Sequence, residues 1–186
     1  AGLPAIGMGS HADTVPSGGK YDGALGVMAA LECAQTLADS NLTLRHPVEV
    51  MVFTNEEGTR FHRWLIGSRA MSGLLLPEDL AAVDDDGVTL ASRMSDIGGD
   101  LSRVDEAQRA AGELAAFFEL HIEQGPVLED KGLAAGIVTA IAGATRLVVS
   151  VEGVSGHAGT VPMELRRDAL VAASECIVAV EKVATR

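Results

Sequence analysis

The sequence predicts an α/β fold whose pattern changes near residue 140. Short apolar runs that end at polar or glycine-rich segments indicate strands. Between them, segments with apolar residues three and four positions apart indicate helices. Such alternation is typical of a sheet layered with helices. We therefore expect a first domain over residues 1–140 and part of a second over residues 141–186.

Three strands are expected in the first domain, over residues 4–8, 48–53 and 117–120. The run 48–53 is almost continuously apolar, which is typical of a strand buried on both faces. Helices are expected over residues 24–37, 68–75, 90–94 and 105–114. Ligands of open α/β sheets bind beyond the carboxyl ends of the strands, so polar residues at those ends are candidate site residues.

The second part of the chain predicts one strand and one helix. Apolar and polar residues alternate over 146–154, which favours a half-exposed strand. From about residue 165 to 183, apolar side chains recur at spacings of three and four and form one apolar helix face.

Composition narrows the class of protein. The net charge of −12 argues against nucleic acid and anionic membrane surfaces as partners. No apolar run reaches the roughly 18 residues of a membrane span, and no leader peptide is apparent.

Cys33 and Cys176 lie in helical patterns, so we expect buried free thiols and a cytoplasmic location. The chain lacks an initiator Met and stops within a helical pattern, so we expect a fragment truncated at both ends.

Five short segments carry groups that could bind metal or move protons. They are residues 9–13, 21–23, 55–58, 121–125 and 156–159. Each alone is a weak signal, but together they indicate a metal site at the strand ends. His11 and Asp13 flank one residue and would point the same way on an extended chain. Asp13 could then accept the second ring N–H of His11, although a loop histidine beside a surface aspartate is the simpler interpretation.

Acidic residues supply the next candidates. Asp22 lies at an expected helix start, where an N-cap is its ordinary role, but its carboxylate could also bridge two metal ions. Glu56 and Glu57 follow the strand 48–53, and adjacent carboxylates repel unless a cation or proton intervenes. One of the pair could bind metal while the other acts as a general base; a solvated pair is the alternative.

Two histidines complete the candidates. His121 follows the strand 117–120 and adds a nitrogen to a set that contains His11 and Asp22, although a lone strand-end histidine is more often structural. His157 lies between glycines in the second part of the chain. We expect it to be a mobile imidazole that stabilises an oxyanion, with a plain turn histidine as the alternative.

Together these segments resemble the metal-dependent amidohydrolases of the M20 peptidase superfamily, and more narrowly its hydantoinase/carbamoylase branch. The matching stretches are residues 9–15, 18–23, 56–61, 67–69, 121–126 and 156–163. The resemblance covers nearly the whole chain. A plain M20 peptidase generally has an acidic residue where His121 stands, so this histidine is specific to the branch. The resemblance implies a mixed-sheet catalytic domain and the start of an α+β lid and dimerisation domain.

The same resemblance implies two divalent metal ions, zinc or manganese, with cobalt and nickel as alternatives. The first would be held by His11, Asp22 and His121. Asp22 would also bridge to the second, which Glu57 would hold together with a histidine outside this chain.

The remaining implied roles concern catalysis and substrate. Glu56 would be the general base, and Gln124 and His157 would contact the substrate. The implied reaction is hydrolysis of the ureido C–N bond of an N-carbamoyl-L-amino acid, giving the amino acid, ammonia and CO2. Allantoate amidohydrolase activity is the alternative, and a non-catalytic fold or dimerisation module is an alternative of another class. The resemblance also implies a homodimer formed through the lid domain.

Overall fold

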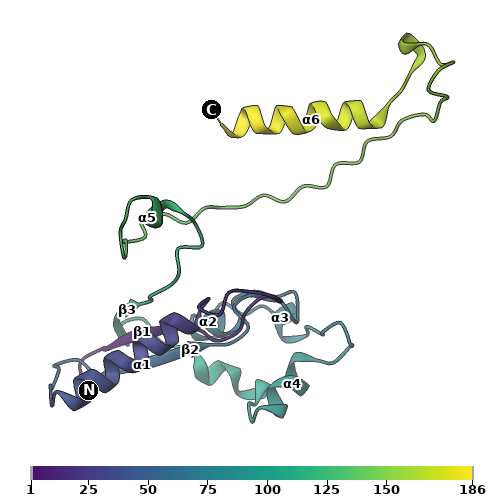
Figure 1. Cartoon of the computed structure of the whole chain (residues 1–186). Coiled ribbons are helices and arrows are strands. Elements are labelled where there is room, and N and C mark those ends of the chain that lie inside the picture. The colour runs from purple at the N-terminus through teal and green to yellow at the C-terminus, as the bar shows by residue number, and fades with distance from the viewer. Residues whose placement is uncertain (1, 186) are drawn as a thin grey trace. The chain divides into compact units, whose positions relative to one another are not determined.

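The computed structural model describes residues 2–185 of the chain. The chain divides into two compact units between Ala135 and Gly136, close to the predicted boundary at residue 140. The first unit contains the sheet and most of the short helices, and the second contains one long helix (Figure 1).

The sheet of the first unit has three strands, β1 (Ala5–His11), β2 (Val48–Phe53) and β3 (Leu114–Phe118). Their order is β2-β1-β3, and β1 pairs in parallel with both neighbours. The predicted α/β class is confirmed, and every pairing among these three strands is parallel. Because parallel strands end at the same edge, residues that follow β1, β2 and β3 meet there.

Burial differs from the prediction on one strand. We expected residues 48–53 to be buried on both faces, but β2 lies at the edge of the sheet and Val52 is 52% exposed. The central strand is β1, and its last two residues, Ser10 and His11, are almost fully buried. His11 therefore lies in a protected position at the carboxyl edge of the sheet.

Helix α1 (Ala24–Asp39) confirms the helix expected over 24–37. Its N-cap is Gly23, with a φ of 62° and no side-chain cap hydrogen bond, so Asp22 does not cap the helix. The helix approaches the sheet closely at Gly26, where an added Cβ would lie 2.2 Å from the carbonyl oxygen of Leu120 and 2.6 Å from Ser10 Cβ. This contact sets the position of the helix start, and with it that of Asp22.

Gly26→Ala tests that close approach. Helix propensity alone would favour alanine by about 1 kcal/mol. We expect the steric overlap to outweigh the gain in helix propensity, because a main-chain carbonyl cannot move aside as a flexible side chain can. We expect a net loss of about 1–3 kcal/mol in the free energy of unfolding, measured by urea denaturation. Ala38→Gly, at an exposed position of the same helix, reports propensity alone; stabilisation by Gly26→Ala would contradict the packing described here.

The rest of the first unit is built from short helical segments. They are α2 (Ile66–Met71), α3 (Pro77–Leu80), α4 (Leu90–Asp96), η1 (Leu101–Ala107) and α5 (Val127–Asp130). A small core, formed by Phe61, Ile66, Ala82 and Leu90, joins α2 and α4. The helix expected over 105–114 is wrong, since a 3₁₀ helix ends at Ala107 and Gly112 turns the chain with a φ of 88°. Such a φ favours glycine and ends a helix.

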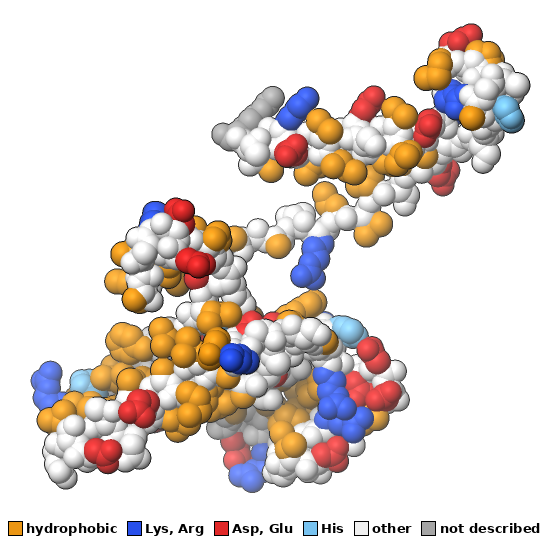
Figure 2. All heavy atoms as spheres, viewed as in Figure 1, with side chains coloured by type: hydrophobic (Ala, Val, Ile, Leu, Met, Phe, Trp, Pro, Cys, Tyr) orange, Lys and Arg blue, Asp and Glu red, His pale blue; other side chains and the backbone are white. Residues whose placement is uncertain are grey.

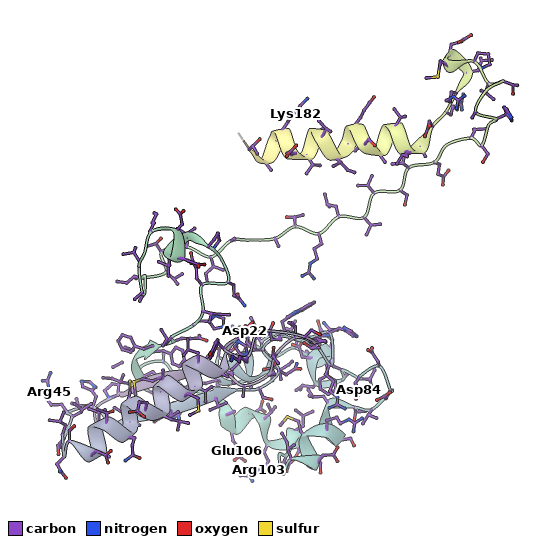
Figure 3. All side chains as sticks on the ribbon, viewed as in Figure 1. Asp22, Arg45, Asp84, Arg103, Glu106 and Lys182 are labelled. Atoms are coloured by element: carbon purple, nitrogen blue, oxygen red, sulfur yellow. The ribbon has the colours of Figure 1, made fainter. Side chains whose placement is uncertain are left out.

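A buried aspartate fastens the loop before α4. Asp84, which is labelled in Figure 3, accepts hydrogen bonds from Arg60 Nε at 3.2 Å and Arg93 Nε at 3.1 Å. It also accepts from the main-chain N–H groups of Asp86 and Val88, at 3.1 and 2.8 Å. Burial acts to raise the pKa of Asp84, but these hydrogen bonds outweigh it and hold the pKa below its usual value. The carboxylate is therefore structural and stays ionised.

The second unit contains η2 (Met163–Leu165) and α6 (Ala169–Ala184), and α6 confirms the predicted C-terminal helix. Asp168 caps α6 by accepting from Leu170 N at 2.9 Å. The strand expected over 146–154 is wrong: these residues form no strand. The alternating pattern describes a face, but a strand also needs a neighbouring strand, and residues 136–185 provide none.

Two general expectations can be compared with the structure. Cys33 and Cys176 are free thiols as predicted, but both are exposed, so the expectation that they are buried is wrong. No helix among residues 2–185 combines the length and the apolarity that crossing a membrane requires.

Candidate metal centre

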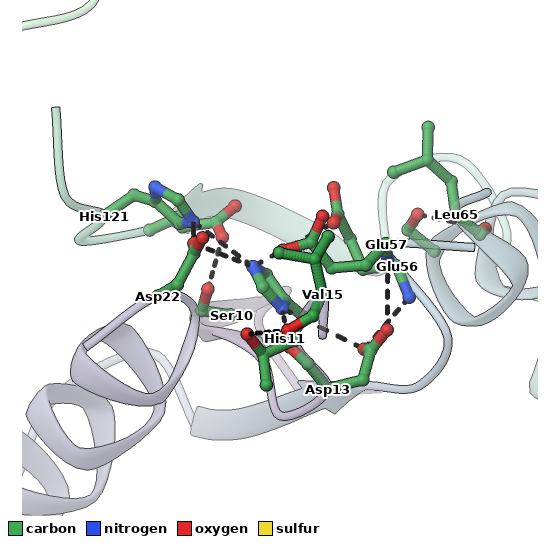
Figure 4. A network of polar contacts seen from close by, with 12 residues as sticks. Ser10, His11, Asp13, Val15, Asp22, Glu56, Glu57, Leu65 and His121 are labelled. Carbon is green, nitrogen blue, oxygen red and sulfur yellow. Dashed lines mark hydrogen bonds and ion pairs between the residues drawn. The ribbon is translucent and has the colours of Figure 1, made fainter. Parts of the chain in front are cut away.

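His11, at the end of β1, is the centre of the polar cluster (Figure 4). Its side chain is 3% exposed, and its Nδ1 lies 2.7 Å from the main-chain oxygen of Asp13. A carbonyl oxygen can only accept, so Nδ1 carries the ring hydrogen. The lone pair of Nε2 is therefore free to bind a cation.

His121 has the same arrangement. Its Nδ1 lies 2.9 Å from the main-chain oxygen of Ile122, so its Nε2 is also unprotonated in the neutral ring. The two Nε2 atoms of His11 and His121 are 3.2 Å apart. Two lone pairs at this distance repel unless a cation or a proton lies between them. His121 lies beyond the last residue of β3, Phe118, rather than directly at the strand end as predicted.

Asp22 supplies the third candidate metal ligand, a carboxylate oxygen. Its Oδ1 lies 3.1 Å from Nε2 of His121 and 3.7 Å from Nε2 of His11. This oxygen is buried and has no hydrogen-bond partner. A buried oxygen without a donor is costly, and a cation in contact with it removes that cost. Ligand atoms of all three residues lie within 4.8 Å of one another, so the donor set fits a divalent transition metal.

A second group shares His11 and adds Glu56 and Glu57, again with one ligand atom each within 4.8 Å. Glu56 Oε2 lies 3.9 Å from Nε2 of His11. Burial raises the pKa of Glu56; His11 opposes this, and the nearby carboxylates of Glu57, Asp13 and Glu119 add to it. A raised pKa suits a carboxylate that takes up a proton during a reaction.

Asp13 makes a different contact from the one expected. Its carboxylate oxygen is 3.9 Å from Nδ1 of His11, too far for a hydrogen bond, and its main-chain oxygen accepts the ring N–H instead. The two carboxylate oxygens accept from the main-chain N–H groups of Glu56 and Glu57, at 3.0 and 3.1 Å. The reason is that β1 ends at His11, so Asp13 no longer follows the extended path that the prediction assumed.

Gln124 lies against Asp22 in this structure. It has a φ of 57°, and its Nε2 donates to Asp22 Oδ2 at 3.0 Å. Its loop is held by Glu123, whose carboxylate accepts from the N–H groups of Val127 and Leu128 at 3.1 and 2.9 Å. The amide of Gln124 thus restrains the outer oxygen of Asp22 while the inner oxygen faces the histidines.

Two polar residues of the site escaped the sequence interpretation. Ser10, fully buried, donates from Oγ to Glu119 Oε1 at 2.6 Å and so ties β1 to the segment after β3. Their positions in the sequence could have identified them, because Ser10 precedes His11 and Glu119 stands two residues before His121.

The predicted site residues fall in two places. The first unit brings together His11, Asp13, Asp22, Glu56, Glu57, His121 and Gln124. His157 belongs to the second unit, where its Nδ1 accepts from Gly159 N at 3.0 Å and its main-chain oxygen accepts from Arg166 Nη2 at 3.4 Å.

Comparison with known proteins gives one consistent result. The chain is 48% identical over 179 residues to an N-carbamoyl-L-amino acid amidohydrolase from Geobacillus stearothermophilus, covering 96% of this chain and 44% of that protein. It is 41% identical over 183 residues to an allantoate deiminase from Arabidopsis thaliana, covering 96% of this chain and 35% of the relative. The chain thus spans less than half the length of these relatives.

A solved structure and a family model agree with these relatives. The crystal structure of a hydantoinase/carbamoylase family amidase from Burkholderia ambifaria matches with a TM-score of 0.79 and 38% identity, covering 98% of this chain and 43% of that one. The sequence model of peptidase family M20/M25/M40 matches residues 7–186. The predicted M20 resemblance is confirmed, and the chain belongs to peptidase family M20/M25/M40, with relatives in its hydantoinase/carbamoylase branch.

Proposed function

We propose that this chain carries the metal centre of an amidohydrolase that cleaves the ureido C–N bond of an N-carbamoyl-L-amino acid. One observation carries the proposal: two unprotonated Nε2 atoms, of His11 and His121, converge on the partnerless Oδ1 of Asp22. Glu56, whose pKa is raised by burial, lies beside them. The names of two similar proteins, an N-carbamoyl-L-amino acid amidohydrolase and an allantoate deiminase, support ureido substrates.

The proposal assigns each residue a task. His11, Asp22 and His121 would hold one ion, and Asp22 and Glu57 would contribute to a second. We favour zinc or manganese, since mixed nitrogen and oxygen donors suit both, with cobalt and nickel as alternatives. When bound, such ions act as Lewis acids that make a water more acidic and polarise a carbonyl group.

Glu56 takes a proton from the attacking water and passes it to the leaving nitrogen. One water is consumed, and the amino acid, ammonia and CO2 are released. His157, on the second unit, is proposed to stabilise the oxyanion.

The direct test measures ammonia released by the native full-length protein, loaded with manganese or zinc, from N-carbamoyl-L-amino acids, their D-enantiomers and allantoate. We expect turnover of the L-carbamoyl compounds, loss of turnover after chelation, and recovery when metal is restored. Preference for allantoate would favour the alternative that the relative from Arabidopsis thaliana suggests. No ammonia from any ureido substrate would overturn the proposal.

A non-catalytic fold module is the alternative of another class. Elemental analysis of this chain separates the two possibilities when it is combined with the ammonia assay. About two ions per chain together with turnover would indicate that the chain is a sufficient catalytic unit. One ion or none, without turnover, would fit a chain that needs further sequence for catalysis.

Assembly forms a separate proposal. Helix α6 exposes apolar side chains along its length, shown in orange in Figure 2. They include Leu170, Val171, Ile177, Val180 and Val183. An exposed apolar surface of this kind marks an interaction site in soluble proteins. We propose that the second unit forms a homodimer, and that the protein is cytoplasmic, in keeping with its free thiols.

Light scattering over a dilution series tests this assembly. We expect a dimer at high concentration that dissociates on dilution. Val180→Glu, which places a charge on the exposed apolar face, should shift the equilibrium toward monomer, whereas Glu181→Gln, next to it on the same helix, should not. A monomer at every concentration would contradict the proposed dimer.

A further inference from the structure

The carboxylate of Asp13 bridges two successive peptide groups. One oxygen accepts from the N–H of Glu56 at 3.0 Å and the other from the N–H of Glu57 at 3.1 Å. Hydrogen bonds from N–H groups to an ionised carboxylate are stronger than those between neutral groups. The contact joins the segment after β1 to the segment after β2, and it restrains both peptide planes of the dipeptide at once.

The same contact argues against a role of the Asp13 side chain in orienting His11. The ring N–H of His11 already has an acceptor, the main-chain oxygen of Asp13 at 2.7 Å. A main-chain oxygen remains whatever side chain stands at position 13. The tautomer of His11 therefore does not depend on the carboxylate.

The Glu56–Glu57 dipeptide needs such a restraint. The residues on either side of it, Asn55 and Gly58, have φ values of 50° and 64°, in the left-handed region. Asn55 Nδ2 donates to Arg63 O at 2.7 Å, which secures one end of the turn. The two glutamates share this turn, and each places a carboxylate oxygen within 4.8 Å of a ring nitrogen of His11, so a rotation of either peptide plane would redirect these oxygens.

We infer that Asp13 is a positioning residue for the Glu56–Glu57 dipeptide rather than for His11. It fixes the two peptide planes from which both carboxylates project toward His11. The inference rests on the proposed function only for the tasks of the two glutamates, one as base and one as metal ligand. The restraint itself is a property of the metal-free chain.

The test compares Asp13→Ala and Asp13→Asn with the unchanged chain. Alanine removes both acceptors, and asparagine keeps one oxygen but turns an NH2 donor toward the other N–H. In amide proton NMR spectra of the metal-free chain, we expect the signals of Glu56 and Glu57 to move upfield and to exchange faster with solvent. The ring nitrogen signals of His11 should keep the pattern of the Nδ1–H tautomer.

Metal titration supplies a second readout. Binding to the group that contains Glu57 should weaken by about 10- to 100-fold, the usual effect of removing a residue that orients a ligand. Binding to the group of His11, Asp22 and His121 should be unchanged. Asp105→Asn, which removes the same charge from an exposed position, is the matched control and should alter neither readout.

The amide and metal-titration results for the Asp13 variants either support or overturn the inference. If Asp13→Ala does not fold, Asp13→Asn, which keeps the shape and one acceptor oxygen, gives the same two readouts. Unmoved Glu56 and Glu57 amides, or a changed His11 tautomer with weaker binding at the His11, Asp22 and His121 group, would overturn it. Because the amide readout needs neither metal nor turnover, absence of ureido hydrolysis would count against the proposed function and leave this inference standing.

Discussion

Glu56→Gln is expected to lower kcat for an N-carbamoyl-L-amino acid by about 10²- to 10⁴-fold in the full-length protein, the usual contribution of a general base. Glutamine keeps the size of the side chain but cannot take up a proton at the carboxylate. In the structure Glu56 Oε2 lies 3.9 Å from His11 Nε2 and burial raises the pKa of Glu56, which suits the proposed role as proton acceptor. Metal content, measured by elemental analysis, should not change.

Glu57→Gln is the matched comparison for Glu56→Gln. Both glutamates belong to the group that includes His11, so proximity alone does not separate a base from a ligand. We expect Glu57→Gln to lower metal content as well as turnover, and Glu32→Gln, at an exposed position of α1, to leave both unchanged. Undiminished turnover of Glu56→Gln would remove the proposed base, and loss of metal in that variant would make Glu56 a ligand.

The elements predicted well from the sequence are those that local pattern determines. Helix α1 begins at Ala24 as expected, because its apolar spacing and the glycine before it are both local signals. The strand 48–53 was also placed correctly. The burial of this strand was predicted wrongly, because burial depends on whether a strand is central or at an edge. No local pattern records the order of strands.

The strand expected over 146–154 and the helix expected over 105–114 were predicted wrongly for related reasons. Residues 146–154 alternate as a strand does, yet a strand forms only where another strand is available to pair with it. The helix expected over 105–114 contained Gly112, whose left-handed φ turns the chain toward β3. In both cases backbone geometry or pairing prevailed over a side-chain pattern.

The sequence was enough to propose most residues of the polar cluster, but not the network of contacts among them. His11, Asp22 and His121 come from three segments, and the parallel order of strands brings these segments to one edge. Which groups bond to which depends on small main-chain movements after each strand. The end of β1 at His11 turned the carboxylate of Asp13 away from the imidazole and toward the peptide groups of residues 56 and 57.

His121→Ala is expected to abolish the tighter of two metal-binding events when zinc or manganese is titrated into metal-free protein by calorimetry. His121 provides one of only two imidazole nitrogens in the first group, and its Nε2 lies 3.1 Å from Asp22 Oδ1. Its removal leaves one nitrogen and one carboxylate. Affinity should fall by more than the roughly 100-fold that marks the upper end for residues that only orient a ligand.

The controls for His121→Ala separate loss of a ligand from general damage. His62→Ala removes an exposed histidine that pairs with Asp85 at 3.0 Å in another loop, and it should leave both binding events intact. His11→Ala removes the other imidazole of the same group, so it should weaken the same first event, and neither histidine variant should abolish the second. Binding that survives both His11→Ala and His121→Ala would mean that the ions are held elsewhere, and that the convergence of the two Nε2 atoms has another cause.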